Sequence, residues 1–142
     1  FLMSLAQSVD LVEYAFTQAT SGDLFVRKAP ASTVAVLLEA VANVIGVPMP
    51  DVDVIGVRHG EKLYESLLGS EEMAKAEDRG GYFRVPLDTR SLDYTPYFEE
   101  GADHGAPTES YTSHNTERLD VAGVERLLLT LPEIQQFRAQ LG

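Results

Sequence analysis

The chain has 142 residues, and its 11 basic and 22 acidic side chains give a formal net charge of −11 and a pI near 4.5. This balance excludes a general affinity for nucleic-acid phosphates or anionic lipid, so any anion must be held by a local basic pocket. The lack of cysteine excludes disulfides and thiolate chemistry, and no run approaches the roughly 20 apolar residues of a membrane span, so we expect a cytoplasmic protein.

The first predicted element is a helix with Ser4 as its candidate N-cap. Its apolar positions recur at helical spacing: Leu5, Val9, Val12 and Phe16. Because the chain begins at Phe1, inside this pattern, we expect it to be part of a longer protein. Residues 23–27 are then typical of a short strand, which ends before Pro30 because the residue preceding a proline avoids the α region.

The clearest helical pattern follows that strand. Ser32 or Thr33 can cap the helix, and Gly46 with Pro48 just beyond can end it. Its expected buried stripe consists of Val34, Leu37, Leu38, Val41 and Ile45. Alternation of apolar and polar residues over 52–57 next predicts a second strand, which delivers the chain to a charged segment.

Shorter elements are expected further along the chain. Leucines spaced as on a short helix occur at Leu63, Leu67 and Leu68. Gly69 then breaks the pattern, and an acid-rich segment that follows it predicts a second helix ending at Gly80. Residues 82–85 are typical of a brief strand.

The stretch from 87 to 116 is polar, rich in turns and without a sustained period. It carries aromatic residues that we expect to anchor it to the protein or to a neighbouring subunit: Tyr94, Tyr97, Phe98 and Tyr111. A helical stripe begins at Val121, Pro132 starts a new helix, and apolar spacing continues to Leu141.

The segment VRHGEKLYE, residues 57–65, carries the most suggestive chemistry. Arg58 offers a planar fork of donors suited to phosphate, and Gly60 permits close approach of backbone or ligand. Glu61 has two acceptor oxygens suited to sugar hydroxyls. Together they could grip the diphosphate and ribose of a nucleotide. The same residues are also explained if Arg58 and Glu61 simply pair with each other or with solvent at a strand-to-helix turn.

Other constellations are weaker. His59, His104 and His114 lie on no shared element at ligand spacing, so we expect no metal site. Asp103 beside His104 has no nucleophile elbow nearby, which argues against a hydrolytic triad. The chain also contains no Gly-x-Gly-x-x-Gly turn, so we expect it to bind no dinucleotide cofactor by itself.

Several segments together resemble one family. They are GDLFVRKAPASTV, VRHGEKLYESLL, AEDRGGYFRVPLDTRSLDY and SYTSHNTERLDVAGVERLLL. Nearly the whole chain resembles the C-terminal portion of bacterial capsule and O-antigen UDP-N-acetylglucosamine 4,6-dehydratases, some of which also epimerise C5. These belong to the extended short-chain dehydrogenase/reductase superfamily, and the Arg-x-Gly-Glu-Lys segment is shared more widely among its nucleotide-sugar enzymes.

The resemblance implies roles for individual residues. Arg58 matches the arginine that contacts the UDP diphosphate, and Glu61 matches the acidic residue that holds the uridine ribose. Lys28 lies in a family segment near the substrate cleft, although an exposed lysine at the end of a strand is the simpler explanation. His59, which stands where many relatives have proline, is interpreted as a turn residue. Arg118 matches a family segment whose role the sequence does not define.

The resemblance also implies a reaction and its partners. The parent enzyme would use NAD or NADP to take hydride from C4 of a UDP-N-acetyl-hexosamine, eliminate water across C5 and C6, and return hydride to C6. The family relies on a tyrosine followed four residues later by lysine, and no such pair occurs here. We therefore expect a substrate-binding portion that is catalytically inactive by itself. The resemblance also implies that the parent enzyme is a homo-oligomer.

The expected fold class is α/β, a small mixed substrate-binding subdomain whose Rossmann core is not in this chain. We expect a substrate-binding subdomain over 1–86, an aromatic loop or arm over 87–116 and a helical segment over 117–142. The alternative is a non-catalytic protein-interaction or oligomerisation module, in which Arg58 and Glu61 form only a surface pair.

Overall fold

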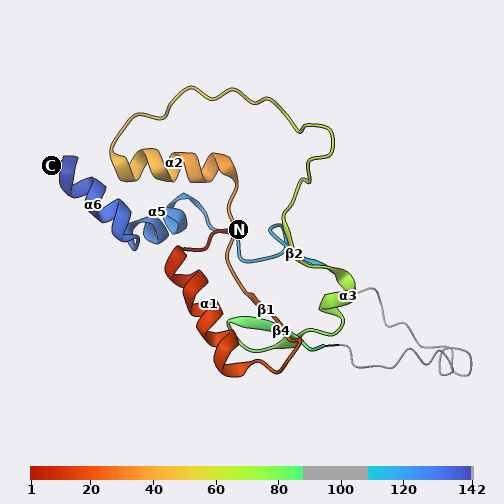
Figure 1. Cartoon of the computed structure of the whole chain (residues 1–142). Coiled ribbons are helices and arrows are strands. Elements are labelled where there is room, and N and C mark those ends of the chain that lie inside the picture. Colours follow the sequence, from red (N-terminus) through yellow and green to blue (C-terminus); the bar gives the residue numbers. More distant parts are fainter. Residues whose placement is uncertain (88–108, 142) are drawn as a thin grey trace, which may run out of the picture. The chain divides into compact units, whose positions relative to one another are not determined.

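The computed structural model describes residues 1–87 and 109–141. The helices of this part of the chain (Figure 1) are α1 (Leu5–Gln18), α2 (Val34–Ile45), α3 (Ser70–Met73), α5 (Val121–Leu129) and α6 (Pro132–Leu141). The strands are β1 (Leu24–Arg27), β2 (Ser66–Leu68), β3 (Glu77–Asp78), β4 (Tyr82–Val85) and β5 (Tyr111–Thr112).

The chain forms two compact units whose segments alternate along the sequence. The helical unit comprises Phe1–Leu5, Ala29–Glu65 and Ser113–Gly142. The sheet unit comprises Ala6–Lys28 and Ser66–Thr112. The expected division at 86 and 116 stays a prediction, since most of its middle segment lies outside the described residues.

The expected fold class, a small mixture of short helices and strands, is confirmed. In the described part of the chain the sheets pair antiparallel, in the orders β1-β4-β3 and β2-β5. Parallel pairing there is limited to a bridge between Ala31 and Arg118. A doubly wound parallel sheet of the kind that binds dinucleotides is therefore not among the described elements.

The core of the helical unit lies between α2 and α5. Ala40 and Val124 are completely buried there and Leu128 nearly so. Partly buried residues surround them: Leu2, Val36, Leu37, Val41, Val44, Leu119, Val121 and Leu131. A hydrogen bond of 2.7 Å from Asn43 Nδ2 to Glu125 Oε1 joins the two helices at the rim.

Both ends of α2 follow the expected capping chemistry. Of the two candidate N-caps, Thr33 takes the role, because its Oγ1 accepts from the Val36 amide at 3.2 Å. Gly46 closes the C-terminus at a φ of 81°, in the left-handed region that glycine adopts without steric cost. The helix therefore begins and ends as its sequence predicts.

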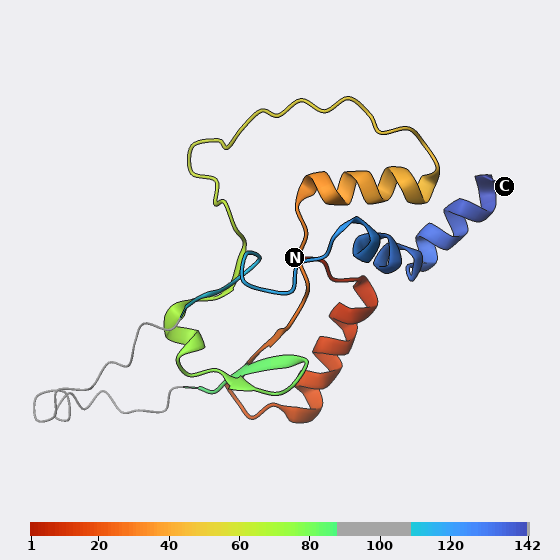
Figure 2. The same cartoon turned by 180° about the vertical axis from the view of Figure 1, so that it is seen from behind.

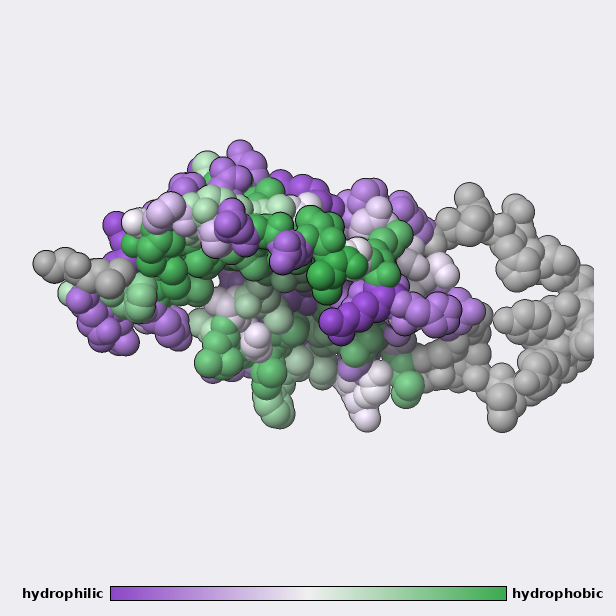
Figure 3. Space-filling view, turned by 90° about the horizontal axis from the view of Figure 1, so that it is seen from above, coloured by the Kyte–Doolittle hydropathy of each residue, from purple (hydrophilic) through white to green (hydrophobic). Residues whose placement is uncertain are grey.

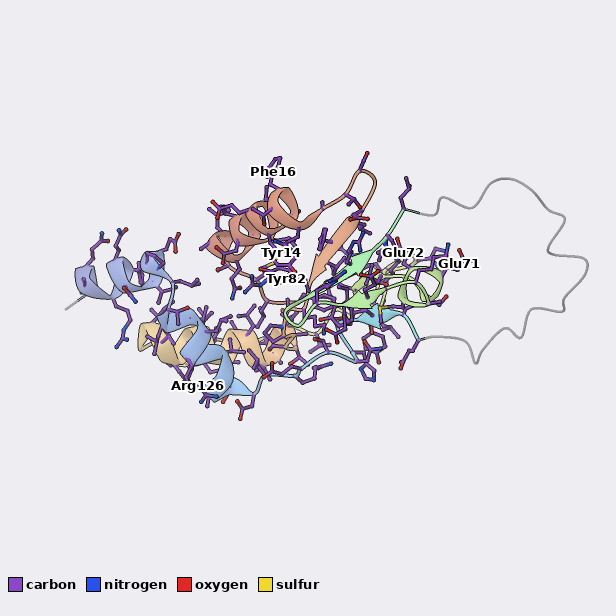
Figure 4. All side chains as sticks on the ribbon, turned by 90° about the horizontal axis from the view of Figure 1, so that it is seen from below. Tyr14, Phe16, Glu71, Glu72, Tyr82 and Arg126 are labelled. Atoms are coloured by element: carbon purple, nitrogen blue, oxygen red, sulfur yellow. The ribbon has the colours of Figure 1, made fainter. Side chains whose placement is uncertain are left out.

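In the sheet unit, α1 packs against the three-stranded sheet. Tyr14 on α1 stacks on Tyr82 of β4, with ring centroids 4.1 Å apart, and meets Phe25 of β1 edge-on at 5.5 Å. Figure 4 shows Tyr14 and Tyr82 side by side, while Phe16 points away from them. Aromatic contacts thus fix the inner face of α1 to the sheet.

The other face of α1 is the apolar stripe seen in the sequence, and it is exposed. Leu5 is 78% exposed and Phe16 86%, with Val9 and Val12 near half. The helix is therefore where the pattern predicts it, but the stripe does not form its contact with the described sheet. Apolar residues likewise reach the surface in the space-filling view (Figure 3). In the described residues, no helix is both long and apolar enough to cross a membrane.

Two predicted elements are wrong. Residues 52–57 form no strand, because a strand needs a neighbour for its backbone hydrogen bonds and this segment pairs with no described strand. Residues 66–68, expected in a short helix, form β2, where Ser66 pairs with Thr112 and Leu68 with Tyr111. A partner distant in sequence overrides the local helical spacing there.

The acidic helix is shorter than predicted. It is a single turn, α3, whose start is held by a 2.7 Å hydrogen bond from the Gly69 amide to Glu72 Oε2. The chain then turns into β3, where Glu77 lies opposite Arg84 of β4. Of the expected aromatic anchors, Tyr111 is buried and meets Phe83 at 5.2 Å. The others lie outside the described residues.

Candidate functional site

Arg58 and Glu61 lie on a long exposed segment of the helical unit. It runs from Val47 to Glu65 between α2 and β2, without helix or strand, and Figure 2 shows it as an extended trace. Its apolar side chains face solvent, with Val54 at 91% and Ile55 at 76% exposure. The predicted site residues are thus presented on a loop and not at the end of a strand.

A tight turn brings Arg58 and Glu61 together. The Glu61 amide donates to the Arg58 carbonyl at 3.0 Å, and Glu61 Oε2 accepts from the Arg58 amide at 2.8 Å. His59 and Gly60 are the central residues, and Gly60 has a φ of 87°. A positive φ at the third position is typical of a type II turn and favours glycine. His59 therefore occupies the turn position expected of it.

The turn leaves the Arg58 side chain exposed. Its guanidinium makes no hydrogen bond or ion pair with a described residue, and Lys62 just beyond the turn is exposed as well. Glu61 contacts the backbone of Arg58 and not its guanidinium, so the two side chains form no ion pair and the guanidinium faces solvent, as the alternative interpretation also allows. A planar cationic fork held at the surface of an acidic chain suits an anionic group such as a diphosphate.

The end of this loop is tied to the segment that precedes α5. Glu65 and Ser113 exchange two hydrogen bonds, at 2.8 Å between their main chains and at 3.1 Å to Ser113 Oγ. The rings of Tyr64 and His114 face each other at 4.3 Å. Arg118 donates to the Ser113 carbonyl at 3.3 Å, which gives this family-segment residue a structural role.

Lys28 belongs to the sheet unit and is described there. Its Nζ lies 2.6 Å from Asp78 Oδ1 and 4.4 Å from the centre of the Phe83 ring. The Asp78 pKa is lowered, chiefly by the hydrogen bond from Lys28 and also by the Gly80 amide. The ammonium is thus engaged in a pair that joins the residue after β1 to the end of β3.

Sequence reasoning missed a charged network in the same unit. Arg84 of β4 bonds both oxygens of Asp23 and reaches Glu77 of β3 at 3.1 Å. The hydrogen bond from Arg84 holds the Asp23 pKa well below its ordinary value of 3.8, and Thr20 adds to the effect. The Glu77 pKa is also lowered, first by Arg79 and then by Arg84. The network's contacts are internal, which indicates a structural role.

The described residues do not fit a metal or a dinucleotide. They include no group of His, Asp and Glu side chains that could hold a metal ion. The glycine-rich turn that would hold the nicotinamide cofactor's pyrophosphate occurs nowhere in the sequence. On the loop that carries the candidate site, the exposed cations Arg58 and Lys62 suit an anionic ligand.

The fold places the chain in a class of small α/β units found within larger proteins. It matches the X-ray structure of Pen from Bacillus thuringiensis with a TM-score of 0.69 and 24% sequence identity. The match covers 92% of this chain and 37% of Pen. At this identity the likeness concerns the fold alone.

Sequence comparison identifies the family. Residues 1–87 match the family described as polysaccharide biosynthesis protein, and residues 88–135 match polysaccharide biosynthesis protein C-terminal. The chain therefore belongs to the polysaccharide biosynthesis protein family.

Curated relatives carry the name of a nucleotide-sugar enzyme. The UDP-glucose 4-epimerase of Rickettsia akari (strain Hartford) is 54% identical over 136 residues, which are 96% of this chain and 40% of the relative. That of Rickettsia prowazekii (strain Madrid E) is 53% identical over the same spans. The chain thus spans about 40% of the length of these relatives.

Proposed function

We propose that the chain is the UDP-sugar-binding part of a nucleotide-sugar-modifying enzyme of polysaccharide biosynthesis, with Arg58 directed at the diphosphate. The observation that carries the proposal is the exposed Arg58 guanidinium on a closed turn. Membership of the polysaccharide biosynthesis protein family and relatives named UDP-glucose 4-epimerase support the ligand class. Because the chain spans about 40% of those relatives, the catalytic groups and the NAD(P) site would lie in the remainder of such an enzyme.

For the reaction, we propose UDP-N-acetylglucosamine 4,6-dehydration, with C5 epimerisation as an added step in some products, on the route to capsule or O-antigen sugars. The motif combination around VRHGEKLYESLL supports it. A second candidate is 4-epimerisation of a UDP-hexose, favoured by the names of the Rickettsia relatives. Both reactions take hydride from C4 of the sugar, so the same binding of the UDP moiety suits either reaction.

Lys28 stays a proposed UDP contact, on the condition that it releases its present partner. Its ammonium is paired with Asp78 at 2.6 Å, so contact with a phosphate requires the lysine to exchange one anion for another. Arg58 needs no such exchange, because its guanidinium has no partner among the described residues. We therefore assign the principal contact to Arg58.

Calorimetric titration with UDP tests the site. Arg58→Ala should weaken UDP binding about tenfold or more, since charge-assisted hydrogen bonds are lost. Arg126→Ala is the matched control: it removes the same charge from an exposed position on α5 (Figure 4) and should leave the affinity unchanged. Equal affinities for the protein and Arg58→Ala would overturn the nucleotide-sugar assignment and favour the interaction module.

Mass spectrometry separates the two reactions. An enzyme of the relatives' length that carries this sequence would be incubated with UDP-N-acetylglucosamine and with UDP-glucose. Dehydration yields a product lighter by one water, whereas 4-epimerisation conserves mass. A product of unchanged mass that separates from its substrate on chromatography would overturn the dehydratase proposal and support the epimerase.

A further inference from the structure

We propose that Glu61 is a positioning residue, which holds the Arg58 backbone in the conformation that presents the guanidinium. The inference rests on the proposed function of Arg58 and assigns a different task to its neighbour. Its basis is the pair of hydrogen bonds that joins the two residues across His59 and Gly60. The ligand remains the diphosphate that Arg58 would bind.

The two bonds close the turn from both sides. The Glu61 amide donates to the Arg58 carbonyl at 3.0 Å, and the Glu61 carboxylate accepts from the Arg58 amide at 2.8 Å. Both polar groups of the Arg58 main chain are therefore bonded to the same residue. This fixes the direction in which the arginine leaves the loop.

This turn is the main source of order in its segment. Residues 48 to 64 are all described, and the two bonds between Arg58 and Glu61 are the hydrogen bonds that they make. A loop without such ties loses conformational entropy when it binds a ligand. By closing the turn before binding, Glu61 lowers that cost for any anion that Arg58 holds, whether or not the anion carries a sugar.

The carboxylate has a structural partner that is independent of any sugar. Oε2 accepts a hydrogen bond from the Arg58 backbone amide, and this bond needs no ligand to form. Gly60 supports the same geometry, since its φ of 87° suits the turn and an added Cβ there would meet nothing within 4 Å. An alanine at this position therefore perturbs the turn by backbone conformation alone.

Two probes separate positioning from ribose contact: UDP, and inorganic pyrophosphate, which has no ribose. The comparison is between Glu61→Ala and Glu61→Gln, because both remove the negative charge and only glutamine keeps an acceptor oxygen for the Arg58 amide. We expect Glu61→Ala to bind both probes about threefold to tenfold more weakly than Glu61→Gln, the range of one hydrogen bond. Gly60→Ala should weaken both probes in the same way.

The affinities of these variants separate the positioning role of Glu61 from the proposed function of Arg58. If Glu61→Ala and Glu61→Gln bind pyrophosphate equally, positioning is overturned, and a loss confined to UDP would instead make Glu61 a ribose contact. If Arg58→Ala leaves both affinities unchanged, the proposed function itself fails. The first result leaves the diphosphate site at Arg58 intact, so the two failures are distinguishable.

Hydrogen exchange gives a readout without ligand. The Arg58 amide should exchange more slowly in the 142-residue chain than in Glu61→Ala, with Glu61→Gln close to the unsubstituted chain. Equal exchange at this amide in all three proteins would overturn the turn as the means of positioning, whatever the ligand affinities.

Discussion

Arg84 and Asp23 form the most completely hydrogen-bonded ion pair among the described residues of the sheet unit. The Arg84 Nε and Nη2 donors meet Oδ2 and Oδ1 of Asp23 at 2.8 and 3.1 Å. The Asp23 side chain is 1% exposed, and Thr20 bonds its Oδ2 through both its amide and its hydroxyl. The pair joins β4 to the turn that precedes β1, so it fixes how the chain enters the sheet.

Removing the arginine should destabilise the sheet unit. In Arg84→Ala the Asp23 carboxylate keeps its enclosed position but loses its cation, which is costly. We expect the Tm to fall by several degrees, measured by circular dichroism. Arg79→Ala is the control, since its pair with Glu77 has both side chains nearly half exposed and should matter little. Equal Tm values for the two variants would contradict a special role for Arg84.

Acid should weaken the same unit. The Asp23 pKa in the folded chain lies below its ordinary 3.8, because Arg84 favours the carboxylate. The contribution is therefore complete at neutral pH and is lost as the pH falls below about 4, where the unfolded chain takes up the proton first. Denaturant unfolding from pH 6 to pH 3 should show a smaller loss in Asp23→Asn than in the unsubstituted chain. The same slope in both would contradict the assignment to Asp23.

Much of the helical unit could be predicted because its signals are local. Thr33 and Gly46 mark the ends of α2, and Pro132 separates α5 from α6. Apolar spacing also located Leu37 and Val41 on the α2 side of the core, but it wrongly placed Val34 in the buried stripe, where this residue is 83% exposed. Caps and helical periodicity depend on neighbours within a few residues, so the sequence alone reports them.

The errors concern elements that depend on distant partners. Residues 52–57 have the alternation of a strand but pair with no described strand, whereas 66–68 have helical spacing and pair with β5. The hairpin of β3 and β4 carried a usable signal that was missed, because Gly80 and Gly81 are typical of a turn between strands.

The candidate site was predicted in its residue types but not in its geometry. The sequence pointed to Arg58 and Glu61 as a pair, and the structure pairs the Glu61 carboxylate with the Arg58 backbone. Glycine at position 60 was interpreted as room for a ligand, and its positive φ shows a turn requirement as well. Which donor a carboxylate chooses depends on backbone conformation, which spacing does not specify.

The core between α2 and α5 should respond to small changes in volume. Val124→Ala removes two methyl groups from a fully buried position and should lower the free energy of unfolding by roughly 2 kcal/mol. Val34→Ala makes the same change at a position that is 83% exposed, and should change the free energy of unfolding by less than about 0.5 kcal/mol. Chemical denaturation measures both. Similar losses would show that the core lies elsewhere.

Two glycines with nearly the same φ should differ in what they control. Gly46 has a φ of 81° and Gly60 of 87°, and a Cβ at either would meet nothing within 4 Å. Gly46 ends α2, where its amide donates to the Ala42 carbonyl at 2.9 Å, so Gly46→Ala should cost about 1 kcal/mol of unfolding free energy. Gly60 lies on an exposed loop outside the core, so Gly60→Ala should leave unfolding nearly unchanged.

Ligand affinity should show the opposite order. Gly60→Ala strains the turn that presents Arg58 and should weaken pyrophosphate binding, while Gly46→Ala acts through α2 and should not. Denaturation and calorimetry on the same two variants measure both effects. Loss of stability in Gly60→Ala equal to that in Gly46→Ala would contradict the separation, because the loop would then share the cooperative unfolding of the helical core. The expected crossed result would instead mean that the turn at Arg58 is kept for binding and not for folding.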